Sequence, residues 1–166
     1  AGKILTHEIG TTPKVQGKHI SLNPDELFAT VIQAMNKSVE GLSSGLKVEK
    51  IYISTLRQGF CLISNEKELT PIFLNSDTSG EMARAEIEKY GFRRIYEETG
   101  HWFAPQLTLP KLINLNRVQP DLVRQNTKLL FVHDWLAWKF TQEIVTEMTL
   151  VSAGQMVKLS DKGIHA

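Results

Sequence analysis

The stretch from Pro120 to Leu150 constrains the fold of this chain more than any other part of the sequence. Its apolar side chains recur at steps of three and four, and this spacing places residues on one face of a helix. Pro120 suits the first position of a helix, where no N–H is needed, and Gly154 suits the end of one. The pattern predicts one long C-terminal helix from Pro120 to about Gly154.

The middle of this stretch, LLFVHDWLAWKF, is apolar on more than one face of the predicted helix. A helix that is apolar nearly all round is either deeply buried or shared with a partner. Both alternatives stay open at this point. Because aromatic side chains dominate interface energetics, Phe131, Trp135 and Trp138 are the candidate partner-binding residues.

Shorter patterns predict the elements before this helix. Asn23 followed by Pro24 reads as the start of a helix over 24–41, with an apolar stripe at helical spacing. Runs rich in strand-forming residues predict strands within 47–54, 59–64 and 69–74. A second helix is predicted over 80–90, ending at Gly91. Residues 92–96 and 101–104 then read as a hairpin.

The predicted order is therefore α-β-β-β-α-β-β-α. This order is typical of an α+β fold, with a mainly antiparallel sheet of about five strands and helices packed on it. We predict an N-terminal arm (1–23), a single domain (24–154) and a C-terminal tail (155–166) that either adds a short strand, MVKL, or is disordered. The order is similar in topology to small dimeric secretion chaperones and to profilin-like modules.

Composition narrows the classes of protein further. The chain has 166 residues and a net charge of +1, which fits one domain and argues against a generally basic nucleic-acid binder. Cys61 is the only cysteine, so no internal disulfide is possible, and this favours a cytoplasmic location. No apolar run approaches the roughly 20 residues that a membrane span needs. We therefore expect no membrane association.

Few residues suggest chemistry. Glu97, Glu98 and His101 flank one predicted turn and could act in acid–base catalysis or bind a metal, but a solvated turn is the favoured interpretation. His133 and Asp134 are adjacent on a helix and diverge, so they form no relay. The sequence lacks the glycine-rich loops that hold nucleotide phosphates. We predict no cofactor and no metal site.

A second group of residues combines positive charge with aromatic rings around Gly91. Basic residues interleaved with aromatic ones can hold phosphates and stack on bases, so this patch is a candidate nucleic-acid interface. The alternative is that the rings pack in the core and the arginines pair with nearby glutamates. The residues concerned are Lys89, Arg93, Arg94, Tyr96 and Trp102.

The leading hypothesis from the sequence is a non-catalytic protein-binding or assembly module, an adaptor or chaperone-like protein that uses the aromatic-rich C-terminal helix. It includes a protein partner or a homodimer formed through that helix. The first alternative is a nucleic-acid-binding module that uses the patch at 89–102. The second is a small enzyme with a Glu/Glu/His site at 97–101.

Overall fold

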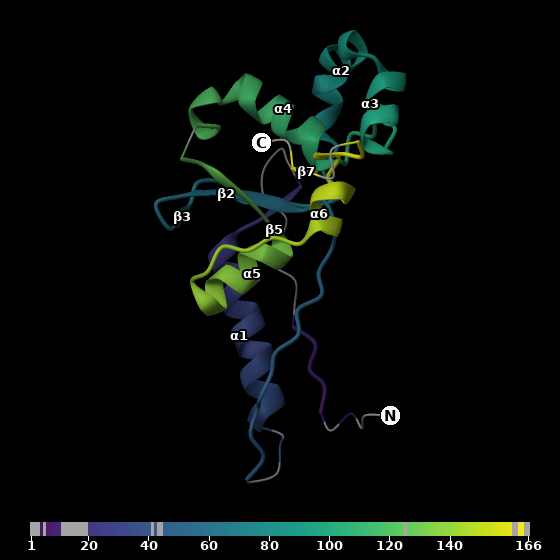
Figure 1. The fold of residues 1–166 in the computed structure, drawn as a ribbon. Coiled ribbons are helices and arrows are strands. Elements are labelled where there is room, and N and C mark those ends of the chain that lie inside the picture. The colour runs from purple at the N-terminus through teal and green to yellow at the C-terminus, as the bar shows by residue number, and fades with distance from the viewer. Residues whose placement is uncertain are drawn as a thin grey trace.

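The computed structural model describes residues 4, 6–10, 20–40, 42, 45–124, 126–160 and 163–164. Within them, five short antiparallel strands form a sheet with helices packed on both faces (Figure 1). This confirms the predicted α+β class with an antiparallel sheet. A second, two-stranded sheet near the C-terminus joins β6 (Val157–Lys158) to β7 (Gly163–Ile164).

Strand β2 (Phe60–Ser64) is the centre of the main sheet. On one side it pairs with β5 (Lys128–Phe131) through four residue pairs. On its other side lie β3 (Lys67–Glu68) and β4 (Ile72–Phe73), and β4 pairs in turn with β1 (Ser21–Leu22). The β2–β3 turn has positive φ angles of 49° and 59° at its two central residues, which matches the twist of a tight hairpin.

Both faces of β2 are buried, which explains the unbroken apolar run in its sequence. Successive side chains of a strand point to opposite faces. Cys61 and Ile63 pack against one layer of helices, whereas Phe60 and Leu62 pack against the other. The first layer is α1 (Pro24–Glu40) with α5 (Val132–Thr141), and the second is α4 (Thr108–Val118) with α6 (Met148–Ala153).

A third layer lies beyond α4 and contains α2 (Arg84–Tyr90) and α3 (Phe92–Thr99), preceded by the 3-10 helix η1 (Ser79–Ala83) (Figure 1). Its small core joins Ala83, Ile87 and Ile95, with Leu109 and Ile113 of α4 packed against them. Helix α4 is therefore apolar towards two layers, the sheet and the α2–α3 pair.

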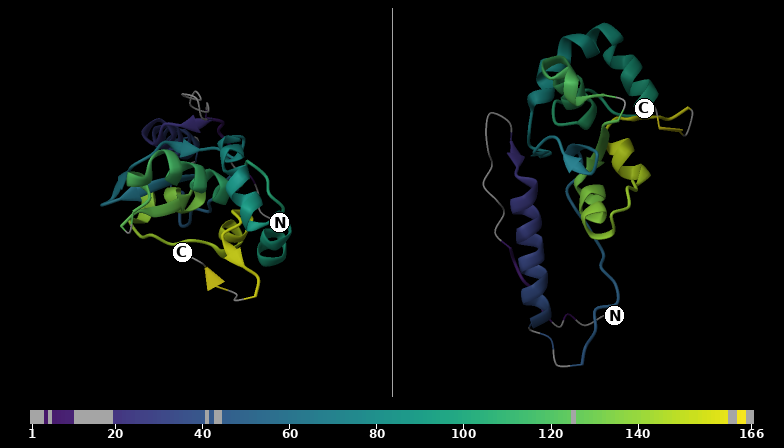
Figure 2. Two further views of the ribbon diagram at one scale, coloured as in Figure 1. Left: turned by 90° about the horizontal axis from the view of Figure 1, so that it is seen from above. Right: turned by 90° about the vertical axis from the view of Figure 1, so that its left-hand side faces the viewer.

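Helix α1 begins where the sequence predicts. The side chain of Asn23 accepts hydrogen bonds from the backbone N–H groups of Asp25 (2.9 Å) and Glu26 (3.2 Å). Helix α1 and the segment 46–57 both extend away from the sheet (Figure 2). The strand predicted within 47–54 does not form, because no described strand pairs with this segment. Tyr52 is 86% exposed there.

The long helix predicted from Pro120 is wrong. In its place the chain forms the 3-10 turn η2 (Pro120–Leu122), strand β5, helix α5 and helix α6. Helix α5 ends at Gln142, which has a left-handed conformation (φ 62°). The apolar character on several faces arises because β5 is buried between two helical layers, and a buried strand cannot be told from a buried helix by periodicity alone.

The hairpin predicted over 92–104 is also wrong, because residues 92–99 form helix α3. Ion pairs at helical spacing join Arg93 to Glu97 (2.8 Å) and Arg94 to Glu98 (2.9 Å). Gly100 ends the helix with a φ of 76°, a conformation that glycine adopts readily. The alternation of residue types at 92–96 indicated a strand, but the charge pattern of the same residues favours the helix.

The remaining predictions concern the second helix, the two ends of the chain and membrane-spanning segments. The helix predicted over 80–90 forms as η1 and α2, and the tail segment MVKL contains β6. Most of the predicted arm at 1–23 lies outside the described residues. Among the helices that the structure describes, none is both long enough and apolar enough to cross a bilayer.

We expect Trp135→Ala to lower the free energy of unfolding by about 3–5 kcal/mol, because Trp135 is fully buried beneath Phe28 in the core. Trp102→Ala is the matched control, since Trp102 is 58% exposed, and it should lower stability by about 1 kcal/mol or less. Urea unfolding of both variants measures the difference. Equal losses for the two would contradict this assignment of the core.

Candidate functional site

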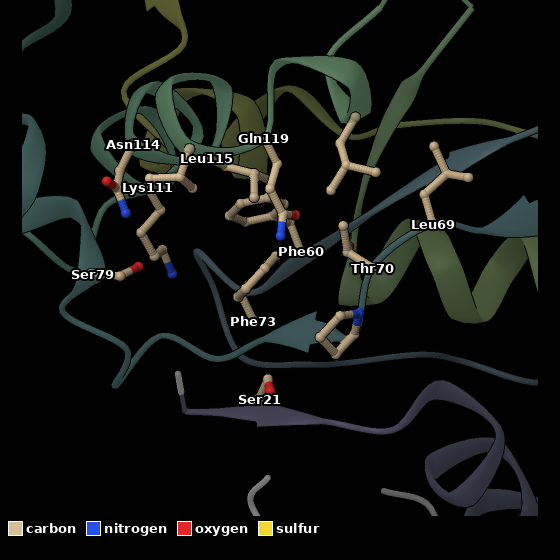
Figure 3. A pocket seen from close by; sticks show the side chains of 13 residues that line it. Ser21, Phe60, Leu69, Thr70, Phe73, Ser79, Lys111, Asn114, Leu115 and Gln119 are labelled. Atoms are coloured by element: carbon tan, nitrogen blue, oxygen red, sulfur yellow. The ribbon is translucent and has the colours of Figure 1, made fainter. Parts of the chain in front are cut away.

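A cavity of about 440 Å³ opens between α4, the strands β2 and β4, and the turn η2 (Figure 3). Its apolar walls include Phe60, Phe73 and Leu115. Polar groups line the remainder: Ser21, Thr70, Ser79, Lys111, Asn114 and Gln119. The volume lies within the range of roughly 300–1,000 Å³ that is usual for small-molecule sites.

Lys111 connects this cavity to the interior. The residue is only 2% exposed, and its ammonium group donates hydrogen bonds to the carbonyl oxygens of Gln58 (2.9 Å) and Leu74 (2.9 Å). Helix α4 is thereby joined to the segments just before β2 and just after β4. Burial lowers the pKa of Lys111 to about 8, and the nearby negative charge of Asp77 opposes this shift.

The polar junction, which we define as Gln58, Asp77, Thr108, Lys111 and Gln155, lies where these segments meet. Thr108 also donates to the carbonyl of Gln58 (3.4 Å), while the Gln58 amide donates to the carbonyl of residue 153 (3.4 Å). Gln155 is 1% exposed, and its side-chain oxygen has no hydrogen-bond partner among the described residues. Several buried polar groups are therefore concentrated in one place.

Glycines allow the close approach of the elements at this junction. A Cβ atom on Gly80 would lie 2.5 Å from the carbonyl oxygen of Pro105 and 3.0 Å from the backbone nitrogen of Lys111. Such contacts with backbone atoms cannot be relieved by a side-chain rotation. Any larger residue at position 80 would therefore push η1 away from the start of α4.

Two further carboxylates lie around the α5–α6 connection. Asp134 is fully buried and accepts hydrogen bonds from the Phe131 backbone N–H (3.4 Å) and the Thr146 hydroxyl (2.7 Å). Its other oxygen lies 3.3 Å from Nδ1 of His133, so the prediction that these two side chains diverge is wrong. Glu147 is exposed and caps α6, and it accepts hydrogen bonds from the backbone N–H (3.0 Å) and the hydroxyl of Thr149. The Thr149 bonds hold the pKa of Glu147 below its usual value, so its carboxylate form is favoured.

The residues predicted to bind a protein partner lie in the core. Phe131, Trp135 and Trp138 are 3%, 0% and 3% exposed. The indole N–H of Trp135 donates to Glu68 (3.0 Å), which also pairs with Lys139 (3.1 Å). Of the two alternatives that the sequence left open for these aromatics, the structure shows the core.

The residues predicted to bind nucleic acid lie on α2, on α3 and in the loop after α3. Arg93 and Arg94 pair with glutamates one turn further along α3, so their charges are largely neutralised. The rings of Tyr96 and Trp102 stack on each other with centroids 4.4 Å apart. Lys89 lies in the last turn of α2. The patch is thus a balanced surface and not a basic one.

The predicted Glu/Glu/His site is not assembled. Glu97 pairs with Arg93, whereas Glu98 accepts from Arg94 and from the Tyr90 hydroxyl. His101 lies beyond the end of α3, and its backbone carbonyl accepts from Gln155 (3.0 Å). Within the described residues, no group of three or more His, Cys, Asp or Glu side chains is placed to hold a metal ion.

Comparison with known proteins identifies the class to which this fold belongs. Residues 4–163 match the model of the FGGY family of carbohydrate kinases, N-terminal domain. The match spans almost the whole sequence. The chain therefore belongs to the FGGY family of carbohydrate kinases and corresponds to its N-terminal domain.

Solved structures show the same fold. A glycerol kinase from Plasmodium falciparum, solved with ADP, superposes with a TM-score of 0.82 at 17% identity, over 95% of this chain and 33% of that one. Xylulose kinase from Lactobacillus acidophilus gives 0.81 at 16% identity, over 94% and 32%. Gluconate kinase from the same organism gives 0.79 at 16% identity, again over 94% and 32%. The chain spans about a third of the length of these proteins.

The family assignment corrects the leading hypothesis drawn from the sequence. A non-catalytic adaptor or chaperone-like module is wrong, and so are the protein-partner and nucleic-acid-binding interpretations, because the chain is a carbohydrate-kinase domain. The topological likeness to secretion chaperones and profilin-like modules reflected only a shared order of elements. The order of helices and strands along a chain does not by itself indicate its function.

Sequence reasoning missed Lys111 and Glu147. Lys111 stands in the run LTLPKLINL, where a lysine among apolar residues at helical spacing is the available signal. Glu147 stands two residues before Thr149, a pattern typical of a capping carboxylate. Lys111 lies between the predicted elements and Glu147 lies inside the predicted long helix, so neither signal points to a site.

Lys111 should make stability depend on pH. Its pKa is about 8 in the folded state, against an ordinary value of 10.5, so between these pH values the unfolded chain binds more protons and stability rises with pH. We expect the free energy of unfolding, relative to that of Lys111→Met, to increase by about 2 kcal/mol from pH 8 to pH 10. Urea unfolding at both pH values measures this.

Wild type and Lys111→Met share every other titratable group. The difference between their free energies of unfolding therefore removes the contributions of those groups to the pH dependence. Burial raises the pKa of the Cys61 thiol, which lowers stability at high pH, but it does so equally in both proteins. A difference between wild type and Lys111→Met that stays constant from pH 8 to pH 10 would contradict the burial of a charged ammonium.

Proposed function

We propose that the chain is the sugar-binding part of a carbohydrate kinase, which transfers a phosphoryl group from a nucleoside triphosphate to a hydroxyl group of a sugar, polyol or sugar acid. The family match over residues 4–163 is the observation that carries this proposal. The structural relatives are named as glycerol, xylulose and gluconate kinases. These three substrates share a chain of neighbouring hydroxyl groups, so this is the substrate class that we propose.

Transfer to a hydroxyl group requires a base that accepts its proton, and kinases use a carboxylate for this step. Such a carboxylate must be ionised, reachable and not already neutralised by a cation. The carboxylates of Glu68, Glu81 and Glu98 pair with lysine or arginine, and Asp134 is fully buried. They are therefore poor candidates.

Glu147 meets the three conditions. Its hydrogen-bond donors are the N–H and hydroxyl groups of Thr149 and the N–H of Leu150, which are neutral, and with a smaller contribution from His133 they favour the ionised form. They also fix the side chain at the start of α6, so it is held in one orientation at the protein surface. We assign Glu147 the role of proton acceptor within the proposed reaction.

The proposed reaction also indicates the location of the protein. A kinase needs a nucleoside triphosphate, and the one cysteine of the chain is a buried free thiol, which is consistent with reducing surroundings. We propose a cytoplasmic location on these grounds.

The test is phosphoryl transfer from ATP to glycerol, xylulose and gluconate, followed by ³¹P NMR, with the protein in which this chain occurs. We expect at least one of the three to be phosphorylated. Glu147→Gln should lower kcat by roughly 10²–10⁴-fold with little change in KM, because a general base contributes about that much. Glu143→Gln is the matched control on the α5–α6 connection and should leave kcat unchanged.

The outcomes separate two parts of the proposal. If none of the three compounds accepts a phosphoryl group, the proposed substrate class is wrong. If transfer occurs but Glu147→Gln retains the wild-type kcat, the kinase assignment stands and Glu147 is not the proton acceptor.

A further inference from the structure

The cavity beside α4 has a lining that carries one cation and, among the described residues, no carboxylate. It also lies on the α4 side of the sheet, lined by residues from β1, β2, β4, η1, α4 and η2, and its lining does not include Glu147. The proposed kinase chemistry therefore leaves this cavity without a role.

Hydrogen-bond donors dominate the polar end of the cavity. The ammonium group of Lys111 has three protons, and the described residues accept two of them through the carbonyls of Gln58 and Leu74. Ser79 and Lys111 both line the cavity, so the Ser79 hydroxyl group and the third proton of Lys111 are donors of this lining.

Two further side chains of the lining carry donors, Asn114 near Lys111 and Thr70 next to Leu69 (Figure 3). The Thr70 oxygen accepts a hydrogen bond from the backbone of Leu62 (3.0 Å), which leaves its own proton to donate. The side-chain oxygen of Asn114 accepts from Arg117 (3.0 Å), which leaves its N–H₂ group to donate. Thr70, Asn114 and Lys111 are all buried, so these donors are held in place and shielded from water.

Apolar side chains line the rest of the cavity and begin at Lys111, whose ammonium nitrogen lies 5.5 Å from the centre of the Phe60 ring. Phe60, Phe73 and Leu115 form walls that are buried within the second helical layer. Leu69 and Val118 lie at its mouth and are 39% and 56% exposed. A ligand that fits has a hydrocarbon body against these walls.

We propose that this cavity is a binding site for a small organic anion, a molecule with one carboxylate or phosphate group at the Lys111 end and an apolar body along Phe60 and Phe73. Asp77 offsets part of the Lys111 charge but does not line the cavity, and the donors that do line it favour an oxyanion, since hydrogen bonds between charged partners are the strong ones. Neutral sugars lack both the charge and the apolar body. This site is therefore separate from the proposed sugar-binding function.

The test measures binding of defined probes to the chain by isothermal titration calorimetry. Hexanoate and hexyl phosphate have the anionic group and the apolar body, whereas hexan-1-ol lacks the charge and inorganic phosphate lacks the body. We expect the tighter of the two anions to bind at least about tenfold more tightly than hexan-1-ol, because a charge-assisted hydrogen bond contributes about that factor. Which anion binds more tightly identifies the head group.

Substitutions in and away from the cavity test whether the anion binds there. Val118→Trp fills the mouth of the cavity from an exposed position and should weaken binding of the anion about tenfold or more, because it excludes the hydrocarbon body. Val145→Trp is the control, since Val145 is equally exposed (53%) and does not line the cavity. Lys111→Met should abolish the preference for the anion over hexan-1-ol.

Lys111→Met could fail to fold, and Ser79→Ala then provides the second test of the polar end, with an expected loss of about threefold to tenfold. Equal binding of hexan-1-ol and the anions would overturn the proposal, as would unchanged binding by Val118→Trp. Binding of inorganic phosphate as tight as that of hexyl phosphate would also overturn it, because the apolar walls would then contribute nothing.

Discussion

The buried ammonium group of Lys111 is the interaction on which the arrangement of this chain depends. Its two hydrogen bonds join α4 to the backbone on either side of the central strands, at Gln58 and at Leu74. Helix α4 then packs on the sheet through Leu115 and on the α2–α3 layer through Ile113. Three layers are thus positioned relative to one another by a single helix that is fixed at its first turn.

The sequence was informative where one local rule decided the outcome. The α+β class followed from the mixture of patterns, and the start of α1 followed from Asn23 and Pro24, because capping depends only on neighbouring residues. The sequence was misleading where contacts between distant residues decide the secondary structure of a segment. Lys128 to Phe131 have an apolar pattern that suits a helix, but pairing with β2 over its whole length makes them a strand.

The site was less predictable than the fold, for a physical reason. The hydrogen bonds of Lys111 join it to Gln58 and Leu74, which are distant from it in sequence and meet it only after the sheet and α4 have formed. No short motif spans such a set. The aromatic residues of the core stand out in the sequence. However, the sequence pattern around Trp135 is the same whether its side chain lies in the core or in an interface with a partner.

The charge of Lys111 needs an explanation beyond stability. Taking an ammonium group out of water is unfavourable, and its lowered pKa is the direct sign of this penalty. An apolar side chain of similar volume would avoid that penalty, but it would leave the carbonyl groups of Gln58 and Leu74 without this donor. Two backbone carbonyls do not require a full positive charge, because a neutral donor satisfies them as well. The nearby charge of Asp77 offsets part of this penalty, and an anion bound in the cavity, as proposed above, would offset more of it.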